Sequence, residues 1–212
     1  MTTKTLLRVG VPLVAITGSN AKSTVTTLVG EMAKAAGLRT GIGGNLGTPA
    51  LDLLRDDAQL YVLELSSFQL ETTTSLRCKA ATILNLSQDH LDRHGTMAHY
   101  GAIKSTIFRG CENAVTNRED AVVMALSPAK ALSFGANPPL AGHYGLVLHD
   151  DATWLAVGDE RLLPMSELRI FGLHNAANAL AALALADAAG IPRDASLRAL
   201  REFGGLAHRC QF

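Results

Sequence analysis

Residues 11–24 read VPLVAITGSNAKST, an apolar run that is followed at once by a glycine and a string of small polar residues. The aliphatic residues of Val11–Thr17 predict a buried strand. After the polar loop, apolar residues recur at helical spacing from Val25 to Ala36, and Gly37 predicts the end of that helix. A strand, a tight loop and a helix therefore follow one another, as they do in loops that bind phosphate.

Apolar runs and alanine-rich helical stretches alternate along the rest of the chain. Strands are predicted at Tyr61–Leu65, at Ala81–Leu86 and near Ala114–Asn117, and helices at Met97–Phe108 and Asn175–Ala189. This alternation is typical of an α/β fold in which helices flank a mostly parallel sheet of the P-loop type. Between residues 121 and 165, the short alternating pieces Gly145–Leu148 and Trp154–Val157 predict a small, partly antiparallel extension.

The composition is that of a globular protein without a strong charge bias. Nineteen basic residues balance nineteen acidic ones, and only 5% of the 212 residues are aromatic, which argues against a protein that reads nucleic acid. We find neither a signal-like leader nor an apolar run long enough to span a bilayer. The three cysteines form no CxxC pair, which suits a reducing compartment. We therefore expect a cytoplasmic protein that binds neither nucleic acid nor membrane.

The candidate phosphate loop combines outward-pointing backbone groups with a lysine. It consists of Gly18, Ser19, Asn20, Ala21, Lys22, Ser23 and Thr24. Backbone N–H groups at the start of a helix have no intrahelical partner, and together with the helix dipole they bind phosphate. Lys22 is placed to reach the β and γ phosphates of a nucleotide, and the hydroxyl of Ser23 is placed to bind Mg²⁺.

Two residues break the strict pattern G-x-x-x-x-G-K-[ST] of such loops. Ile16 and Ala21 stand where the two glycines belong. Alanine is tolerated there if Ala21 has already entered the helix with a negative φ. The alternative is an ordinary strand-to-helix turn that Ser19 or Asn20 caps, with Lys22 in solvent.

Polar side chains also mark the ends of two further predicted strands. Glu64 lies in the strand YVLEL, and the run Asn85–His94 follows the strand ATIL. Because doubly wound sheets bind ligands at the carboxyl ends of their strands, Glu64 could hold the Mg²⁺ that neutralises nucleotide phosphates. A glutamate on an edge strand in water is the alternative.

Five segments of the chain together resemble the ATP-dependent Mur ligases of peptidoglycan synthesis. They are TGSNAKST at 17–24, GGNLGTPALDLL at 43–54, ELSSFQLE at 64–71, NLSQDHLDRHG at 85–95 and FGLHNAANALAALALA at 171–186. They occur in the family's order, and the resemblance runs from about Val11 to the last residue. GGNLGTPALDLL and ELSSFQLE look like the branch of the family that adds D-glutamate. The departure is Ala21, where the family has glycine.

The resemblance implies roles for the polar residues of these segments. Lys22 would hold the β and γ phosphates of ATP, and Ser23 with Glu64 would hold one Mg²⁺. His90 would bind a second Mg²⁺ together with Lys104, which is carbamylated in the family. Lys22, His90 and Lys104 are thus the candidate catalytic residues. Without the family match, Lys104 would be a lysine on a helix surface, its stem laid along neighbouring aromatic rings.

The same resemblance implies binding roles for five further positions. Asn45 and Ser66, like His90, would lie near the acceptor substrate and the transferred phosphate. Asn175 and Asn178 would face the adenine side of ATP, and Arg209 would reach the nucleotide. The simpler alternatives are a turn asparagine, a serine at a strand end, a helix cap at Asn175 and a tail arginine in solvent.

The family's reaction is an ADP-forming ligation of small molecules through an acyl phosphate. For the D-glutamate-adding branch, UDP-N-acetylmuramoyl-L-alanine and D-glutamate are the substrates beside ATP. We expect residues 1–10 to be a tail, 11–206 the central ATP-binding domain, and 207–212 the start of a linker to a C-terminal domain. With its flanking domains missing, the chain would be a monomer that does not ligate. Two alternatives remain: a ligase similar to folylpolyglutamate synthase, and a nucleotide-binding module without catalysis.

Overall fold

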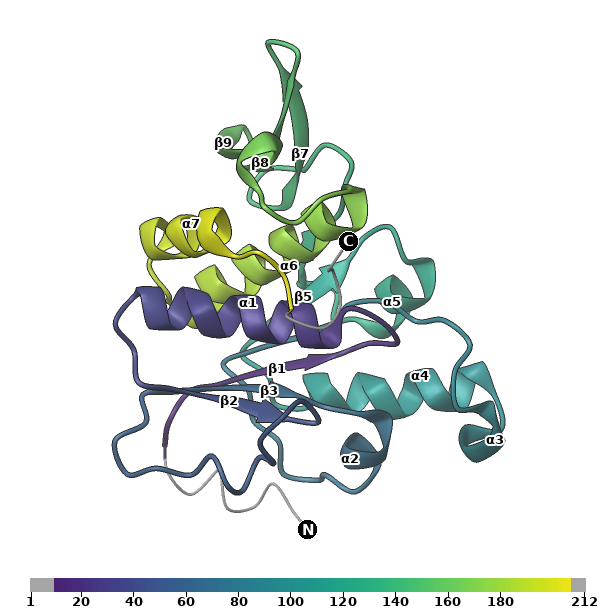
Figure 1. Cartoon of the computed structure of the whole chain (residues 1–212). Coiled ribbons are helices and arrows are strands. Elements are labelled where there is room, and N and C mark those ends of the chain that lie inside the picture. Colours follow the sequence, from purple (N-terminus) through teal and green to yellow (C-terminus); the bar gives the residue numbers. More distant parts are fainter. Residues whose placement is uncertain (1–9, 207–212) are drawn as a thin grey trace.

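The computed structural model describes residues 10–206, whose strands form one mixed sheet (Figure 1). The strand order is β2-β3-β1-β4-β5-β6-β7-β8-β9; neighbours from β2 through β7 are parallel, and β7-β8 and β8-β9 are antiparallel. The strands are β1 Leu13–Thr17, β2 Thr40–Gly44, β3 Leu60–Glu64, β4 Ala80–Ile83, β5 Asn113–Asn117, β6 Leu132–Phe134, β7 Tyr144–His149, β8 Ala152–Val157 and β9 Glu160–Pro164. The predicted fold class, including the antiparallel extension, is confirmed.

Helices cover both faces of the parallel part of the sheet. α1, α6 and α7 lie together on one face, and α2 and α4 lie on the other (Figure 1). The helices are α1 Lys22–Ala35, α2 Ser67–Glu71, α3 Leu91–His94, α4 Met97–Ser105, α5 Ala121–Leu126, α6 Leu173–Ala189 and α7 Arg193–Glu202, with 3₁₀ turns at Thr106–Phe108 and Met165–Glu167.

The apolar sequence of β1 follows from its central position between two helical layers. All five of its residues are buried. Val14 and Ile16 belong to the hydrophobic cluster on the side of α1 and α6, whereas Leu13 and Ala15 belong to the cluster on the opposite side. Because side chains alternate along a strand, a strand that is covered on both faces needs an unbroken apolar run.

The alanine-rich sequence of α6 explains how it lies so close to its neighbours. Every residue from Ala179 to Ala186 is fully buried, so this part of the helix is enclosed on all sides. Small side chains allow the helix axis to approach both the sheet and α1, which a ring of larger side chains would prevent. Gly190, with φ +82°, ends the helix in the left-handed conformation that glycine adopts without strain.

Three strands and several short helices were not predicted from the sequence. β2 has the sequence TGIGG, which carries almost no strand signal. Its glycines are instead required by close packing, since a Cβ on Gly41 would lie 2.7 Å from the ring of Tyr61. β6 has three residues, and the helices α2, α3 and α5 span six residues or fewer, so each gives too few periodic positions to be recognised. β9 and α7 were also missed, although they are as long as elements that were predicted.

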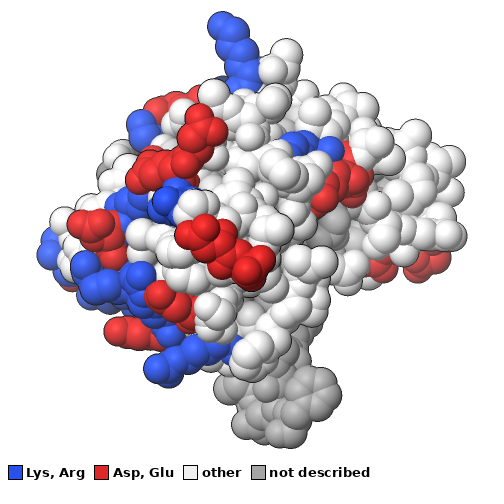
Figure 2. Space-filling model, turned by 90° about the horizontal axis from the view of Figure 1, so that it is seen from above, with Lys and Arg blue, Asp and Glu red and all other residues white. Residues whose placement is uncertain are grey.

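The charged surface matches the balanced composition. On the face shown in Figure 2, Lys and Arg side chains lie beside Asp and Glu side chains rather than in a patch of one sign. None of the helices between residues 10 and 206 is long and apolar enough to cross a membrane.

Candidate functional site

The polar segments that follow β1, β3 and β4 meet at the carboxyl ends of these strands. β1 lies between β3 and β4, with Ile16 paired to Glu64 and Thr17 paired to Ile83, so the three strands end at the same level. A cavity of about 370 Å³ opens at this edge, lined by residues 19–23, residues 45–47 and Glu64. The carboxyl ends of parallel strands are the usual place for a ligand in such a sheet.

Ala21 adopts a conformation that the sequence did not predict. It is the N-cap of α1 with φ +64° and ψ 0°, so the expectation of a helical alanine with negative φ is wrong. A left-handed alanine costs on the order of 1 kcal/mol because its Cβ crowds the following carbonyl group. The turn is therefore the one that glycine would make, held by a residue that does not favour it.

The N-terminus of α1 receives no cap from a side chain. Ser19 and Asn20, which an ordinary turn would use as caps, make hydrogen bonds to residues 85 and 87 instead. The Nζ atom of Lys22 donates to the carbonyl oxygen of Ser19 at 3.0 Å, so the lysine bends back over the loop. Uncapped N–H groups beside a lysine suit an anion such as a phosphate.

Glu64 is a buried carboxylate shared by two other candidate residues. It is 2% exposed, because β3 lies inside the sheet, and the alternative of an edge-strand glutamate in water is wrong. Its Oε2 atom accepts a hydrogen bond from the hydroxyl of Ser23, and its Oε1 atom accepts one from the Nδ2 atom of Asn45, both at 2.8 Å. A carboxylate and a hydroxyl in contact form an oxygen donor set that fits Mg²⁺.

Lys104 lies beneath the phosphate loop rather than on a helix surface. It is only 2% exposed, so the alternative of a surface lysine is wrong. Its Nζ atom donates to the Oγ1 atom of Thr17 at 3.1 Å and to the carbonyl oxygen of Gly18 at 3.0 Å. The same nitrogen lies 4.8 Å from the ring centre of Tyr100.

Burial makes the amine of Lys104 unusually acidic. Desolvation and the nearby charge of Lys22 lower the pKa of Lys104 to about 7, although Asp89 and Glu64 act in the opposite direction. A large fraction of this amine is therefore neutral at neutral pH. A neutral amine is a nucleophile, whereas an ammonium group is not.

His90 stands at the start of α3, on the segment that follows β4. It has φ +51°, and its side chain is 48% exposed. Its ring lies 5.2 Å from that of Phe68, and its Nε2 atom is 3.5 Å from the Oδ2 atom of Asp89. The ring is open to a ligand, and it lies beside Phe68 and Asp89.

His94 joins α3 to α2 and was missed by the sequence analysis. It is 4% exposed, and its Nε2 atom lies 3.0 Å from the hydroxyl of Ser67. An ion pair of 2.9 Å between Arg93 and Glu71 spans the same two helices. These contacts fix the short helix that begins at His90.

Ser66 has a structural explanation. It is the N-cap of α2 and forms a capping box with Gln69, in which each side chain bonds the other's backbone N–H group. A capping box of this kind stabilises a short helix by about 1 kcal/mol. It lies two residues beyond Glu64, the last residue of β3.

The two asparagines of α6 are bonded to each other at the start of that helix. Gly172, not Asn175, is the N-cap. The Nδ2 atom of Asn175 donates to the carbonyl oxygen of Phe171 at 2.9 Å, and Asn178 donates to the Oδ1 atom of Asn175 at 3.2 Å. Arg209 lies outside the described residues, as does the predicted linker 207–212.

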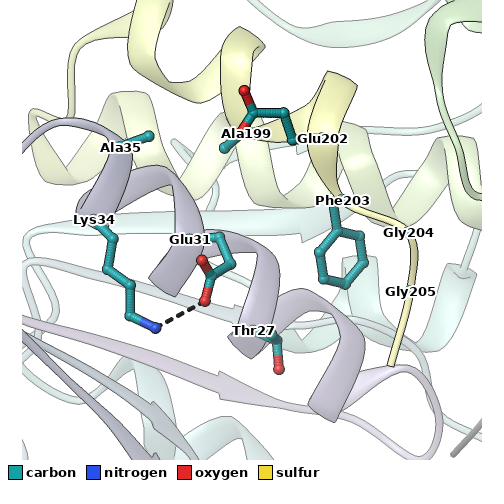
Figure 3. A pocket seen from close by; sticks show the side chains of 9 residues that line it. All are labelled: Thr27, Glu31, Lys34, Ala35, Ala199, Glu202, Phe203, Gly204 and Gly205. Atoms are coloured by element: carbon teal, nitrogen blue, oxygen red, sulfur yellow. Dashed lines mark hydrogen bonds and ion pairs between the residues drawn. The ribbon is translucent and has the colours of Figure 1, made fainter. Parts of the chain in front are cut away.

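A larger cavity, of about 510 Å³, lies between α1 and the end of α7. Figure 3 shows Glu31 and Lys34 of α1 paired with each other on one side of it and Phe203 on the other. None of the candidate site residues lines this cavity. The candidate site is therefore assigned to the smaller cavity, which Glu64, Lys22 and the uncapped start of α1 line together.

Comparisons with known proteins identify relatives of this chain. A family model, the Mur ligase middle domain, matches residues 16–186. UDP-N-acetylmuramoylalanine–D-glutamate ligase from Hahella chejuensis is 58% identical over 203 residues, which cover 95% of this chain and 46% of that protein. The enzyme of the same name from Pseudomonas aeruginosa is 59% identical over 203 residues, which cover 95% of this chain and 45% of that protein. The chain thus spans about half the length of the curated relatives it matches.

Solved structures show the same architecture. The structure of a UDP-N-acetylmuramoyl-L-alanyl-D-glutamate–2,6-diaminopimelate ligase is similar with a TM-score of 0.79 at 27% identity, over 95% of this chain and 48% of that one. UDP-N-acetylmuramate-alanine ligase from Thermotoga maritima is similar with a TM-score of 0.73 at 28% identity, over 97% of this chain and 48% of that one.

Proposed function

Since the chain belongs to the Mur ligase family, we propose that residues 11–206 are the central ATP-binding domain of a ligase that joins D-glutamate to UDP-N-acetylmuramoyl-L-alanine. The observation that carries this proposal is the identity of 58% and 59% with two D-glutamate ligases across 95% of the chain. The motif ELSSFQLE at 64–71 favours this substrate over the folate substrate of the related synthase.

The phosphate loop, residues 18–24, would hold the triphosphate of ATP. The proposal is supported by the uncapped N-terminus of α1 and by Lys22, whose amine already lies over the loop. The adenine would lie toward Asn175 and Asn178 at the start of α6, with Arg209 reaching the nucleotide. These contacts orient the γ phosphate without forming a covalent bond to the protein.

Mg²⁺ would be held by residues that are suited to it. Ser23 and Glu64 would bind one ion, and the 2.8 Å contact between their oxygen atoms supports this pairing. His90 and carbamylated Lys104 would bind a second. When bound, Mg²⁺ supplies the positive charge that offsets the negative charge of the transferring phosphoryl group.

The reaction would proceed in two transfers. A carboxylate is a poor electrophile because its negative charge repels an amine. The L-alanine carboxylate of the acceptor would attack the γ phosphate of ATP, giving an acyl phosphate and ADP, and the D-glutamate amine would then displace phosphate to form the amide. Asn45 and Ser66 would lie beside the acceptor, and Lys22 would stabilise the charge on the phosphoryl oxygens.

Carbamylation of Lys104 is a testable part of this proposal. We expect ¹³C-labelled carbon dioxide to give a carbamate signal from Lys104 in the NMR spectrum of the chain, beside that of the α-amino group, since the amine is buried and its pKa is lowered to about 7. At constant carbon dioxide pressure the signal should grow from about pH 6 to about pH 8, because the neutral amine increases as pH rises through its pKa. The signal should be missing in Lys104→Arg. Persistence of this signal in that variant would assign the carbamate to another amine.

The experiment that tests the function uses the chain alone and within a longer protein. We expect calorimetry to detect binding of a non-hydrolysable ATP analogue with Mg²⁺ to the chain alone. In a separate assay with ATP itself, the chain alone should not release ADP when D-glutamate and the acceptor are added, because three substrates must be positioned together. Release should appear when the chain replaces the matching part of a full-length relative. A chimera that folds and binds ATP but releases ADP only with a folate acceptor would overturn the assignment.

A further inference from the structure

Hydrogen bonds join the phosphate loop to the segment after β4, beyond the ends of both strands. The backbone pairing of β1 with β4 continues as Leu84 N–H donates to the carbonyl oxygen of Thr17 at 2.9 Å. One step further, Ser19 N–H donates to the carbonyl oxygen of Asn85 at 3.0 Å. Gly18 permits this approach, since a Cβ there would lie 3.2 Å from the Cβ of Leu84.

The side chain of Asn85 then holds the peptide groups on both sides of Asn20. Its Oδ1 atom accepts a hydrogen bond from Asn20 N–H at 2.8 Å, and its Nδ2 atom donates to the carbonyl oxygen of Asn20 at 3.2 Å. A side-chain amide presents a donor and an acceptor side by side, which suits this pair of contacts. The carbonyl of Asn20 belongs to the peptide unit that leads into Ala21.

Two serines extend the same contact. Ser87 N–H donates to the Oγ atom of Ser19 at 3.0 Å, and this hydroxyl lies 3.1 Å from the carbonyl oxygen of Ser87, to which it donates. The Oγ atom of Ser19 also lies 3.3 Å from the hydroxyl of Tyr100. The loop is thereby fixed to the segment that carries Asp89 and His90.

We propose that Asn85 is a positioning residue of the phosphate loop, which fixes the peptides of Asn20 and thereby imposes the left-handed turn at Ala21. The turn is strained for alanine, and strained backbone persists only where surrounding contacts over-determine it. Asn85 supplies that contact at the adjoining peptide. This turn sets the direction of the first N–H groups of α1, which would bind the phosphates.

This inference deepens the proposed function and rests on it for its effect on nucleotide binding. The two can be separated because the geometry of the loop can be observed without nucleotide. Asn85→Ala removes both side-chain bonds to Asn20 and leaves the backbone bonds in place. Asn113→Ala is the matched control, since the Nδ2 atom of Asn113 bonds the carbonyl oxygens of Lys79 and Ala188 at the opposite end of β4 and β5.

The first readout is residue-resolved amide hydrogen exchange of the ligand-free chain. In Asn85→Ala, exchange at Asn20 N–H should accelerate by at least about tenfold, which corresponds to the loss of one protecting hydrogen bond. Asn113→Ala should leave this rate within about twofold. Unchanged exchange at Asn20 in Asn85→Ala would overturn the inference, whether or not the chain binds nucleotide.

The second readout is affinity for the ATP analogue with Mg²⁺, measured with and without Ala21→Gly. Asn85→Ala should weaken binding by roughly tenfold when residue 21 is alanine, and by about threefold or less when it is glycine, because glycine keeps the left-handed turn without support. Equal losses in both backgrounds, or a similar loss in Asn113→Ala, would overturn the role of Asn85 in the turn. Absence of binding by the unaltered chain would count against the proposed function, and exchange at Asn20 would still decide this inference.

Discussion

The Lys22→Ala variant is expected to bind the ATP analogue with Mg²⁺ about tenfold to a hundredfold more weakly than the unaltered chain, since a charged hydrogen bond to phosphate contributes about 1.5–3 kcal/mol. Lys22 is half-buried, so its contact with the phosphates would be only partly screened by water. The substitution also removes the hydrogen bond that Lys22 donates to the carbonyl oxygen of Ser19 within the loop. Calorimetric titration of the two proteins measures the difference.

Lys34→Ala is the matched control for this substitution. Lys34 lies in the last turn of the same helix, is exposed, and pairs with Glu31 at 2.8 Å. Its loss removes the same formal charge, and exposed ion pairs contribute at most about 1 kcal/mol to stability. We expect its nucleotide affinity to stay within about twofold of the unaltered chain. An equal loss of affinity in both variants would mean that net charge, rather than a contact made by Lys22, attracts the nucleotide.

Much of the fold could be predicted because the central strands are covered on both faces. Their burial favours mostly apolar runs, and β1, β3 and β4 have them, each with one polar or charged residue. β2 was missed because its residues are selected by close approach to Tyr61 and not by strand propensity. β2 is an edge strand, and its place in the sheet and the packing that accepts its glycines exist only once the sheet has assembled.

The sequence could predict that some polar residues would lie together, but not the conformation of the loop that carries them. Residue types and their order pointed to Lys22, Ser23 and Glu64, and the structure brings these three to one cavity. The left-handed turn at Ala21 could not be predicted, because an alanine gives no local signal for positive φ. We infer that this turn depends on Asn85, which is 64 residues away from Ala21 in the sequence. In the sequence, Asn85 is only one residue of the polar run that follows the strand ATIL.

The burial of Lys104 was likewise invisible in the sequence. Its helical spacing from Tyr100 is equally compatible with a solvated helix face. Only the packing of α4 beneath the phosphate loop brings the amine to Thr17 and Gly18, and this burial is what lowers its pKa. The pKa of Lys104 therefore follows from the tertiary packing around its amine and not from the residues near it along the helix.

The largest effect on stability is expected at Asp187, which joins the antiparallel extension to the helical layer. This carboxylate on α6 accepts hydrogen bonds from the hydroxyl of Tyr144 on β7 and from the guanidinium group of Arg193 on α7, at 3.0 Å from Nε and 2.6 Å from Nη2. Its side chain is 17% exposed, so water replaces these partners poorly. Burial and the neighbouring carboxylate both raise the pKa of Tyr144, so the phenol remains a donor at neutral pH.

Asp187→Ala should lower the free energy of unfolding by about 3 kcal/mol, because it leaves a half-buried guanidinium group and a buried phenol without their shared acceptor. Urea denaturation followed by circular dichroism measures this change. Glu160→Ala is the control, since Glu160 bonds the same Arg193 from a position that is 61% exposed, and we expect it to cost about 0.5 kcal/mol or less. If the two variants lose the same free energy, the extension is held by its apolar contacts and Asp187 is only one more surface charge.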